Sequence, residues 1–256
     1  MRSVVRLGLA LFLSTTLIVQ GAELGLKGAW LFDDTSDVVR DGIGGANGKI
    51  KGSAKWSNNG KSGGALELPG KGDSYAWVPY AKWMDSDPYT FVAWTKLDAA
   101  SWQYIVWQDG EVWPEARKGR HLDIWVHEAD YPVTMWHTDA GVEGRIDAKA
   151  VIADGKWHHI GLTSDGKKMR LYVDGALDGE ADIGGKLVAN GQDAFWFGAR
   201  PGDVAATGLM DDIGFFAQAL SENELKRVMS DGLAPILAVE SRGKLGVFWA
   251  QLRKGL

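Results

Sequence analysis

Short stretches of alternating hydrophobic and polar residues recur along most of the chain, and this pattern is typical of β-strands with one face in a core. The stretches that predict strands are residues 27–32, 65–68, 75–78, 89–96, 103–107, 121–128, 133–137, 157–164, 169–173, 195–197 and 208–216. Between them, Asp165-Gly166 and Asp174-Gly175 predict tight turns or hairpins. The chain therefore favours a succession of short strands joined by turns.

One segment ahead of the C-terminal tail has helical character, residues 221–229. Ser221 is a favourable N-cap and Glu224 stands three residues later, which is the spacing of a capping box. Many short strands and a single short helix near the C-terminus predict an all-β fold, a jelly-roll sandwich of two antiparallel sheets.

Composition narrows the function classes. The 256 residues include 34 glycines and 13 tryptophans but no cysteine, and the net charge is −5. Without cysteine there is no disulfide framework, no thiolate zinc site and no cysteine nucleophile. The negative charge argues against a nucleic-acid partner held by a basic surface. The abundance of tryptophan raises the hypothesis of a surface on which ligands stack.

The two ends of the chain differ from its body. Arg2 and Arg6 precede an apolar run over residues 7–19 and small residues at 21–22, which is the pattern of a secretory signal peptide over residues 1–21. The alternative is an uncleaved membrane anchor. We expect one domain over residues 22–232, an apolar and basic tail over 233–256, and no transmembrane segment after signal removal. The tail is interpreted as a docked terminal strand or a surface-attachment segment.

Five segments in order along the chain resemble one known family. They are Trp30-Leu31-Phe32-Asp33-Asp34, residues 88–94, Gly155-Lys156-Trp157-His158-His159-Ile160, Leu171-Tyr172-Val173-Asp174-Gly175, and residues 208–216 followed by Ala219-Leu220-Ser221. Together they resemble a laminin-G-like domain of the concanavalin A-like lectin/glucanase superfamily. The resemblance implies a jelly roll that binds sugars, proteins or matrix, often with calcium; fold alone does not settle function.

The stretch 121–128 is the most informative for a binding site. Alternation places Leu122, Ile124 and Val126 on the core face. On the opposite face it places imidazoles, a carboxylate and an indole, a combination that suits sugar recognition: His121, Asp123, Trp125 and His127. The following stretch, residues 133–137, is expected to pair with this one and to bring Trp136 or His137 alongside the binding face, with Trp136 as a further candidate ligand-binding residue. The alternative is a polar face that satisfies its own hydrogen bonds.

A charged segment, residues 109–120, precedes this stretch and is expected to form an exposed loop. Trp113 stands before a proline in it, where a ring is available for stacking, and Arg117 and Arg120 suit a carboxylate or sulfate of an acidic glycan. The expected partner is a polysaccharide, a glycoconjugate or a surface protein.

The same stretch tests for glucanase catalysis. Enzymes of the superfamily carry a Glu-x-Asp-x-x-Glu-like pattern, but here His121 takes the first position, and Glu128 falls on the opposite face from Asp123. Retaining hydrolysis needs two carboxyl groups about 5–5.5 Å apart. We therefore expect a non-catalytic binding module, with a glycoside hydrolase or lyase and a structural or adhesive surface protein as the alternatives.

Metal binding has two candidate places. The neighbours His158 and His159 point to opposite faces of a strand, so they are expected to bond backbone or turn groups rather than grip one ion. The superfamily resemblance implies a structural calcium held by Asp33 and Asp211, with carbonyl groups near residues 63–64 completing the shell. The alternative is that these aspartates cap loops and turns.

An exported chain without disulfides suggests a bacterial source and a secreted, cell-surface or periplasmic location.

Overall fold

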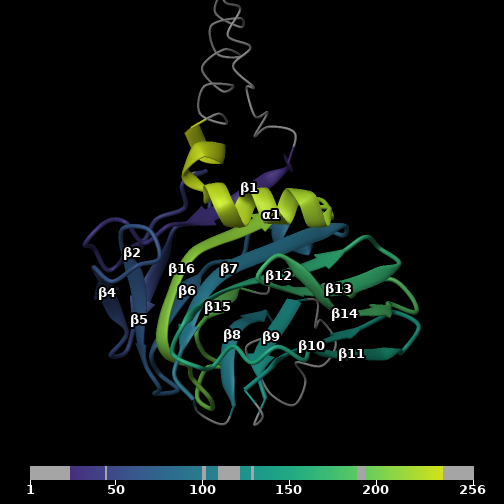
Figure 1. The fold of residues 1–256 in the computed structure, drawn as a ribbon, viewed down its shortest axis with the longest axis horizontal. Helices are drawn as coiled ribbons and strands as arrows, with labels where there is room; N and C mark the ends of the chain where they lie inside the picture. Colours follow the sequence, from purple (N-terminus) through teal and green to yellow (C-terminus); the bar gives the residue numbers. More distant parts are fainter. Residues whose placement is uncertain are drawn as a thin grey trace, which may run out of the picture.

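The computed structural model describes residues 24–43, 45–99, 102–108, 122–127, 130–188 and 194–238. Within them the chain forms two antiparallel sheets packed face to face, so the predicted sandwich is confirmed (Figure 1). Sheet A contains β1 (Leu26–Trp30), β4 (Lys55–Ser57), β5 (Ala65–Pro69), β7 (Tyr89–Leu97), β12 (Trp157–Ser164), β13 (Lys168–Val173), β14 (Ala176–Asp182) and β16 (Thr207–Phe216). Sheet B contains β2 (Val38–Val39), β3 (Gly48–Lys51), β6 (Tyr75–Val78), β8 (Gln103–Gln108), β9 (Leu122–Val126), β10 (Pro132–His137), β11 (Glu143–Asp147) and β15 (Phe195–Phe197).

The strand orders show long crossovers between the sheets. Sheet A runs β14-β13-β12-β7-β16-β5-β4, with β1 also paired to β16, and sheet B runs β11-β10-β9-β8-β15-β6-β3-β2. β7 is central and buried along nearly its whole length, which explains its almost unbroken apolar sequence. Every stretch predicted as a strand contains one.

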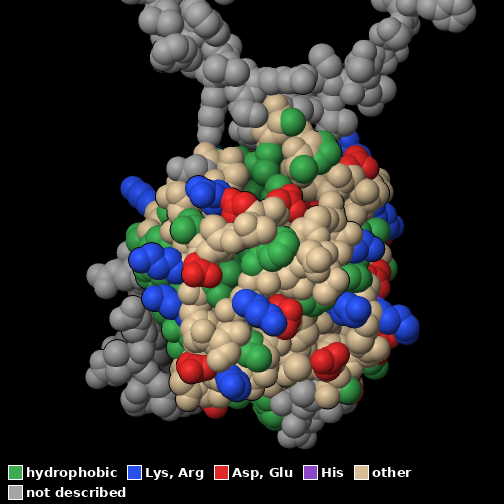
Figure 2. Space-filling view, turned by 90° about the vertical axis from the view of Figure 1, so that its left-hand side faces the viewer, with side chains coloured by type: hydrophobic (Ala, Val, Ile, Leu, Met, Phe, Trp, Pro, Cys, Tyr) green, Lys and Arg blue, Asp and Glu red, His purple; other side chains and the backbone are tan. Residues whose placement is uncertain are grey.

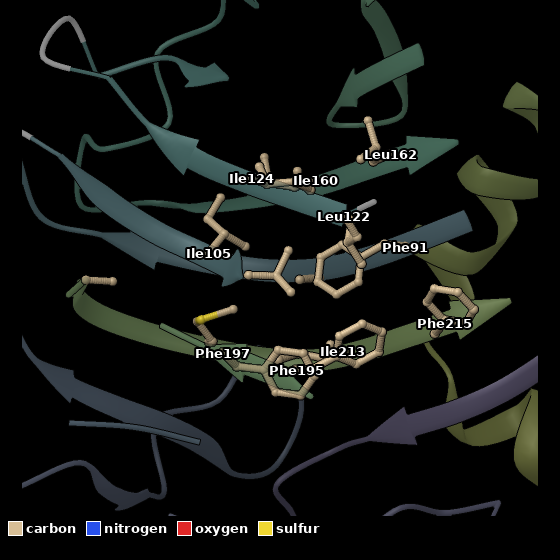
Figure 3. Packing of buried hydrophobic residues seen from close by; sticks show 14 of the residues in the cluster. Phe91, Ile105, Leu122, Ile124, Ile160, Leu162, Phe195, Phe197, Ile213 and Phe215 are labelled. Atoms are coloured by element: carbon tan, nitrogen blue, oxygen red, sulfur yellow. The ribbon is translucent and has the colours of Figure 1, made fainter. Parts of the chain in front are cut away.

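The main core lies between the two sheets. Phe91 and Leu162 from sheet A meet Ile105 and Ile124 from sheet B (Figure 3). Phe195 and Phe197 of β15 and Phe215 of β16 extend this layer. The ring of Phe215 stacks on that of Tyr89 at 5.6 Å between centroids. Burial of this apolar surface is the main source of stability in such a sandwich.

The outer face of sheet A is partly covered by α1 (Glu222–Asp231), whose Leu225 and Val228 pack on Val92 and Phe216. The predicted capping box is present: the Ser221 backbone N–H donates to Glu224 Oε2 at 2.7 Å, and the Glu224 N–H donates to Ser221 Oγ. A short 3₁₀ helix, η2 (Lys82–Asp85), precedes β7.

Five described strands were not predicted: β2, β3, β4, β11 and β14. They are short or lie at or near sheet edges, where polar side chains face solvent and the apolar pattern fades. β14 shows this best, because its sequence Ala-Leu-Asp-Gly-Glu-Ala-Asp is exposed or half-buried throughout. The Asp174-Gly175 hairpin joining β13 to β14 is confirmed, with φ of 50° and 76° at these residues.

The beginning of the expected tail belongs to the folded body. Leu233 and Ile236 are buried in the cluster beneath α1, and residues 234–238 are helical rather than a strand. Residues 239–256 lie outside the described part of the chain, as do the expected signal peptide and residues 22–23. Across the described ranges, no helix combines the length and hydrophobicity that a membrane crossing requires.

Candidate functional site

A row of three tryptophans crosses the outer face of sheet B. Trp196 on β15 lies directly opposite Trp77 on β6 and Trp107 on β8, and Trp107 lies opposite Asp123 on β9. Partners in antiparallel register present their side chains on the same face. We call Trp77, Trp196, Trp107 and Asp123 the indole row.

A second line of side chains runs beside the indole row. Tyr104 on β8 lies opposite Trp125 on β9, and Trp125 lies opposite Val133 on β10. The Tyr104 ring meets the Trp107 ring edge to face at 5.3 Å and the Trp125 ring at 6.1 Å. These rings form one cluster, distinct from the main core and from the cluster beneath α1.

A β-bulge in β8 brings Tyr104 and Trp107 to the same face. Tyr104 pairs with Trp125 and Val106 with Ile124, so Ile105 is the extra residue between them. Ile105 and Val106 are consecutive in sequence, yet both lie in the main core. The bulge reverses the alternation and turns Trp107 outward.

The rings differ in accessibility. Trp107, Trp125 and Trp196 are only 3–5% exposed, whereas Trp77 and Tyr75 are partly exposed. Described groups over the buried rings include the guanidinium groups of Arg200, 5.2 Å from Trp107, and Arg145, 5.7 Å from Trp125. A ligand approaching this face therefore meets the Trp77 end first.

The predicted alternation of β9 is present. Leu122, Ile124 and Val126 lie in the main core, and Trp125 faces outward beside Tyr104. Asp123 is also outward, next to Trp107, but it is fully buried rather than solvated as expected. The two faces of β9 therefore carry the predicted residues, but the outer face is less exposed to solvent than expected.

His127 lies just beyond β9 between two rings. Its imidazole stacks on Tyr131 at 5.4 Å with 16° between planes, and Trp102 lies 5.0 Å away on a residue with φ of 59°. His127 Nδ1 and Trp125 Nε1 are both buried, and neither has a hydrogen-bond partner among the described residues. The two nitrogens belong to alternate residues that face the same way.

The other candidate residues divide into two groups. Trp136 was expected on the binding face, and that placement is wrong: it is fully buried in the main core, where its Nε1 donates to the Ile183 carbonyl at 3.2 Å. Gly144 on β11 makes room for it, since a Cβ there would lie 2.0 Å from the indole. Trp113, Arg117, Arg120 and His121 lie outside the described residues.

The sequence analysis did not identify Trp77, Tyr104 or Trp196 as residues of this face. A signal was available for two of them. Tyr75 and Trp77 alternate with the buried Ala76 and Val78 in β6, and Trp196 is flanked by core phenylalanines in β15. The bulge that turns Trp107 outward has no such signal.

Charged groups at the β10–β11 end of sheet B are paired. Arg145 Nε donates to Asp147 Oδ2 at 2.7 Å, and this hydrogen bond raises the pKa of Arg145 and lowers that of Asp147. His137 Nε2 lies 3.0 Å from Glu143. The charges of Arg145 and Asp147 therefore largely cancel.

The two adjacent histidines behave as the alternation predicts. His159 is buried on the outer face of sheet A against the edge of Trp94 at 5.2 Å, and burial lowers its pKa to about 4. His158 instead reaches the carboxylates of Asp174 and Asp154, at 2.8 and 3.1 Å. They do not converge on one point, and the described residues contain no metal-ligand group of three or more His, Cys, Asp or Glu.

Asp33 and Asp211 converge on the loop at residues 61–64. Asp33 Oδ1 accepts the Gly64 N–H at 3.1 Å, and Asp211 Oδ2 accepts the Ser62 N–H at 3.0 Å. Burial raises the pKa of Asp211 to about 7, and the negative charge of Asp212 adds to this. These two carboxylates supply too few ligands for calcium by themselves, so calcium requires the loop carbonyls and stays a prediction.

One detail of this place differs from the expected alternation. Strict alternation along β16 would place Asp211 on the same face as Ile213 and Phe215. A bulge between Asp211 and Gly214, with φ of 45° at Asp212, puts Asp211 on the outer face opposite Trp94, while Ile213 and Phe215 lie in the core.

Charge on the side of the molecule formed by β2, β4 and β5 is mixed. Figure 2 shows lysines or arginines interspersed with acidic side chains and small hydrophobic areas on that side. A dominant basic field of the kind that holds nucleic acid is not seen there.

Comparison with known proteins agrees with this architecture. A laminin G family model described as the concanavalin A-like lectin/glucanases superfamily matches residues 70–226. No curated protein sequence matches the chain. Structural matches include the binding domain of Paraclostridial mosquitocidal protein 1, with a TM-score of 0.61, 16% identity, and coverage of 80% of this chain and 51% of that one.

Two further solved structures carry ligands in their names. The binding domain of botulinum neurotoxin DC in complex with SialylT gives a TM-score of 0.63 at 12% identity, covering 81% of this chain and 51% of that one. Domain 4 of AbnA, an extracellular arabinanase of Geobacillus stearothermophilus, in complex with arabinotriose, gives 0.54 at 18% identity, covering 79% and 97%. The chain spans about half the length of the toxin domains and nearly all of the arabinanase domain.

Proposed function

Because the chain belongs to the concanavalin A-like lectin/glucanases superfamily, we propose that it is a non-catalytic module that binds a polysaccharide or glycoconjugate through the outer face of sheet B. The observation that carries this proposal is the indole row, in which three tryptophans on adjacent strands lead to a carboxylate.

The row has the chemistry of a sugar site. Indole rings cover the apolar faces of sugar rings, and carboxylate oxygens accept hydrogen bonds from hydroxyl groups. Trp77 is the accessible end of the row and Asp123 the buried end. A glycan chain lying across β6, β15 and β8 would contact the rings in succession, once the side chains over Trp107 make way.

The structural matches support a binding role without naming the ligand. One matching domain is solved with arabinotriose, and the binding domain of botulinum neurotoxin DC is solved once with SialylT and once with rat synaptotagmin II. We favour a glycan because three tryptophans lie in register on this face, next to a carboxylate. A protein partner is an outcome that the binding experiment distinguishes.

The non-catalytic part of the proposal rests on β9. Asp123 is the one carboxylate on the outward positions of that strand as far as it is described, and Trp107 and Trp125 are its neighbours in register and sequence. Retaining hydrolysis needs a second carboxyl group about 5–5.5 Å away. Release of reducing sugar by the purified chain, lost in Asp123→Asn, would contradict this part.

Export to a bacterial surface, periplasm or medium completes the proposal, on the basis of the signal-like residues 1–21. Fusion of these residues to a reporter and fractionation of the cells tests it. A reporter retained in the cytoplasm would remove the export step.

The central test is a polysaccharide pull-down with two matched tryptophan variants. Trp77→Ala removes the partly exposed ring of the indole row, and Trp157→Ala removes a partly exposed ring on the outer face of sheet A. We expect Trp77→Ala to weaken binding at least about 10-fold and Trp157→Ala to leave it unchanged. Arabinan is the first glycan to try, and equal binding by both variants would remove the proposed face.

A further inference from the structure

Three buried ring nitrogens at the β9–β10 end of sheet B have no hydrogen-bond partner among the described residues: Trp125 Nε1, His127 Nδ1 and His137 Nδ1. Trp125 Nε1 is a donor on a side chain that is 3% exposed, and His127 is only two residues away in sequence. Buried polar atoms are nearly always bonded, so the neighbouring pair at Trp125 and His127 points to a bonding group that the described residues do not supply.

The surroundings of these nitrogens are aromatic and accessible at the rim. His127 lies between Tyr131, stacked at 5.4 Å, and Trp102, which is 38% exposed. Arg145 lies over the Trp125 ring with a side chain that is 39% exposed. Trp102 and the Arg145 side chain therefore form the accessible rim of this end, and the two nitrogens lie beneath it.

Among the described residues at this end, the arginines are already paired. Arg145 is bound to Asp147, and Arg200 lies 3.4 Å from Asp203. An anionic ligand would have to compete with these carboxylates for the two guanidinium groups. A hydroxyl group needs no such exchange, since it accepts from the indole N–H and either donates to or accepts from the imidazole.

We propose that the ligand of this face is an uncharged glycan, and that one of its hydroxyl groups bonds Trp125 Nε1 and His127 Nδ1. This inference rests on the proposed function and specifies the ligand class and a subsite at the end of the face opposite Trp77. The Trp102, His127 and Tyr131 rings border the subsite.

The opposite edge offers the contrasting possibility. Lys49 on β3 lies opposite Trp77 and faces the same way. An acidic glycan would use this lysine, and its binding would weaken with added salt because exposed charges are screened. Salt dependence therefore separates the two ligand classes.

The experiment measures affinity for neutral and acidic polysaccharides at low and high ionic strength. The neutral set is arabinan, arabinoxylan and a β-glucan, and the acidic set is polygalacturonate, alginate and a sulfated glycan. We expect binding to a neutral member that changes less than about 2-fold with salt. Binding confined to the acidic set, lost at high salt and weakened by Lys49→Ala, would overturn the inference and leave the proposed function standing.

A variant tests the subsite directly. His127→Phe keeps a ring between Trp102 and Tyr131 but removes both ring nitrogens, so we expect about 3- to 10-fold weaker binding with an unchanged melting temperature. His158→Phe on sheet A is the control and should bind as the wild type. Unaltered binding by His127→Phe overturns the subsite, whereas no binding to any member of either set overturns the proposed function and this inference together.

Discussion

The guanidinium carbon of Arg200 lies 5.2 Å from the centroid of the Trp107 ring, so a cation covers the indole that faces Asp123. Arg200 also lies 3.4 Å from Asp203, which is half exposed. A cation over an indole contributes about 0.5–1 kcal/mol, and an exposed ion pair contributes less. The ring contact is therefore the larger of these two contributions to stability.

We expect Arg200→Ala to lower the free energy of unfolding by about 1 kcal/mol and to make Trp107 more accessible to acrylamide quenching. Asp203→Ala removes the ion pair alone and should cost less than about 0.5 kcal/mol. Urea denaturation of both variants measures the difference. Equal losses would show that Arg200 acts through Asp203 rather than through the ring.

His159 gives the fold a dependence on pH. Burial lowers its pKa from 6.5 to about 4, opposed by the charge of Asp174 and assisted by that of Lys61. The unfolded chain then binds more protons between these values, so this contribution is complete above about pH 6.5 and is lost as the pH falls toward 4. We expect a loss of about 2 kcal/mol between pH 7 and pH 5 from this residue.

The matched variant for this pH dependence is His159→Phe, which keeps a ring against Trp94. Buried Asp211 and Asp212 titrate in the same range, because their pKa values are raised to about 7 and about 6, but they do so in both proteins. The difference between the two stability curves therefore isolates His159. Parallel curves would contradict the assignment.

Asp41 organises the loop between β1 and β3. Its buried carboxylate accepts four backbone N–H groups, from Ala29, Ile43, Gly45 and Ala46, at 2.9 to 3.0 Å. Asp41→Ala leaves these donors without their acceptor and is expected to cost about 3 kcal/mol or more. Asp34→Ala removes an exposed partner of Arg40 and should change stability by less than about 1 kcal/mol in the same urea titration.

Calcium is tested by thermal melting with calcium, with magnesium and with a chelator. We expect calcium to raise the unfolding midpoint of the wild type, since a ligand that binds only the folded state stabilises it. In Asp211→Asn the loop at residues 61–64 keeps an acceptor but loses a charge, so the calcium effect should disappear. Identical midpoints in calcium and chelator would exclude a calcium site at Asp33 and Asp211.

Strands with a strong pattern of apolar residues were predictable from the sequence, and their predicted ends lie close to those in the structure. β7, β12 and β16 combine length with apolar residues at regular spacing, and the capping box of Ser221 and Glu224 identifies the start of α1. Edge strands were missed because solvent tolerates polar residues there, so β14 carries little apolar pattern.

The candidate face was predicted only in part, for geometric reasons. Alternation in β9 placed Asp123 and Trp125 correctly. Trp136 was misassigned because the sequence of a strand does not show whether the face that carries an indole is buried or exposed. The space that the buried Trp136 ring occupies depends on Gly144 of the neighbouring strand. Trp77 and Trp196 join the row through strand pairing between distant segments, which local sequence does not reveal.

The bulge at Ile105 in β8 determines which face of sheet B carries Trp107. If the bulge were lost while all residues were kept, strict alternation would turn Trp107 into the core and Gln108 toward the surface, although no residue of the face itself would have changed. A change that removes this bulge at constant chain length is therefore a larger structural event for the indole row than a single surface substitution. In related sequences, a Tyr and a Trp three positions apart share this face only where the bulge is kept.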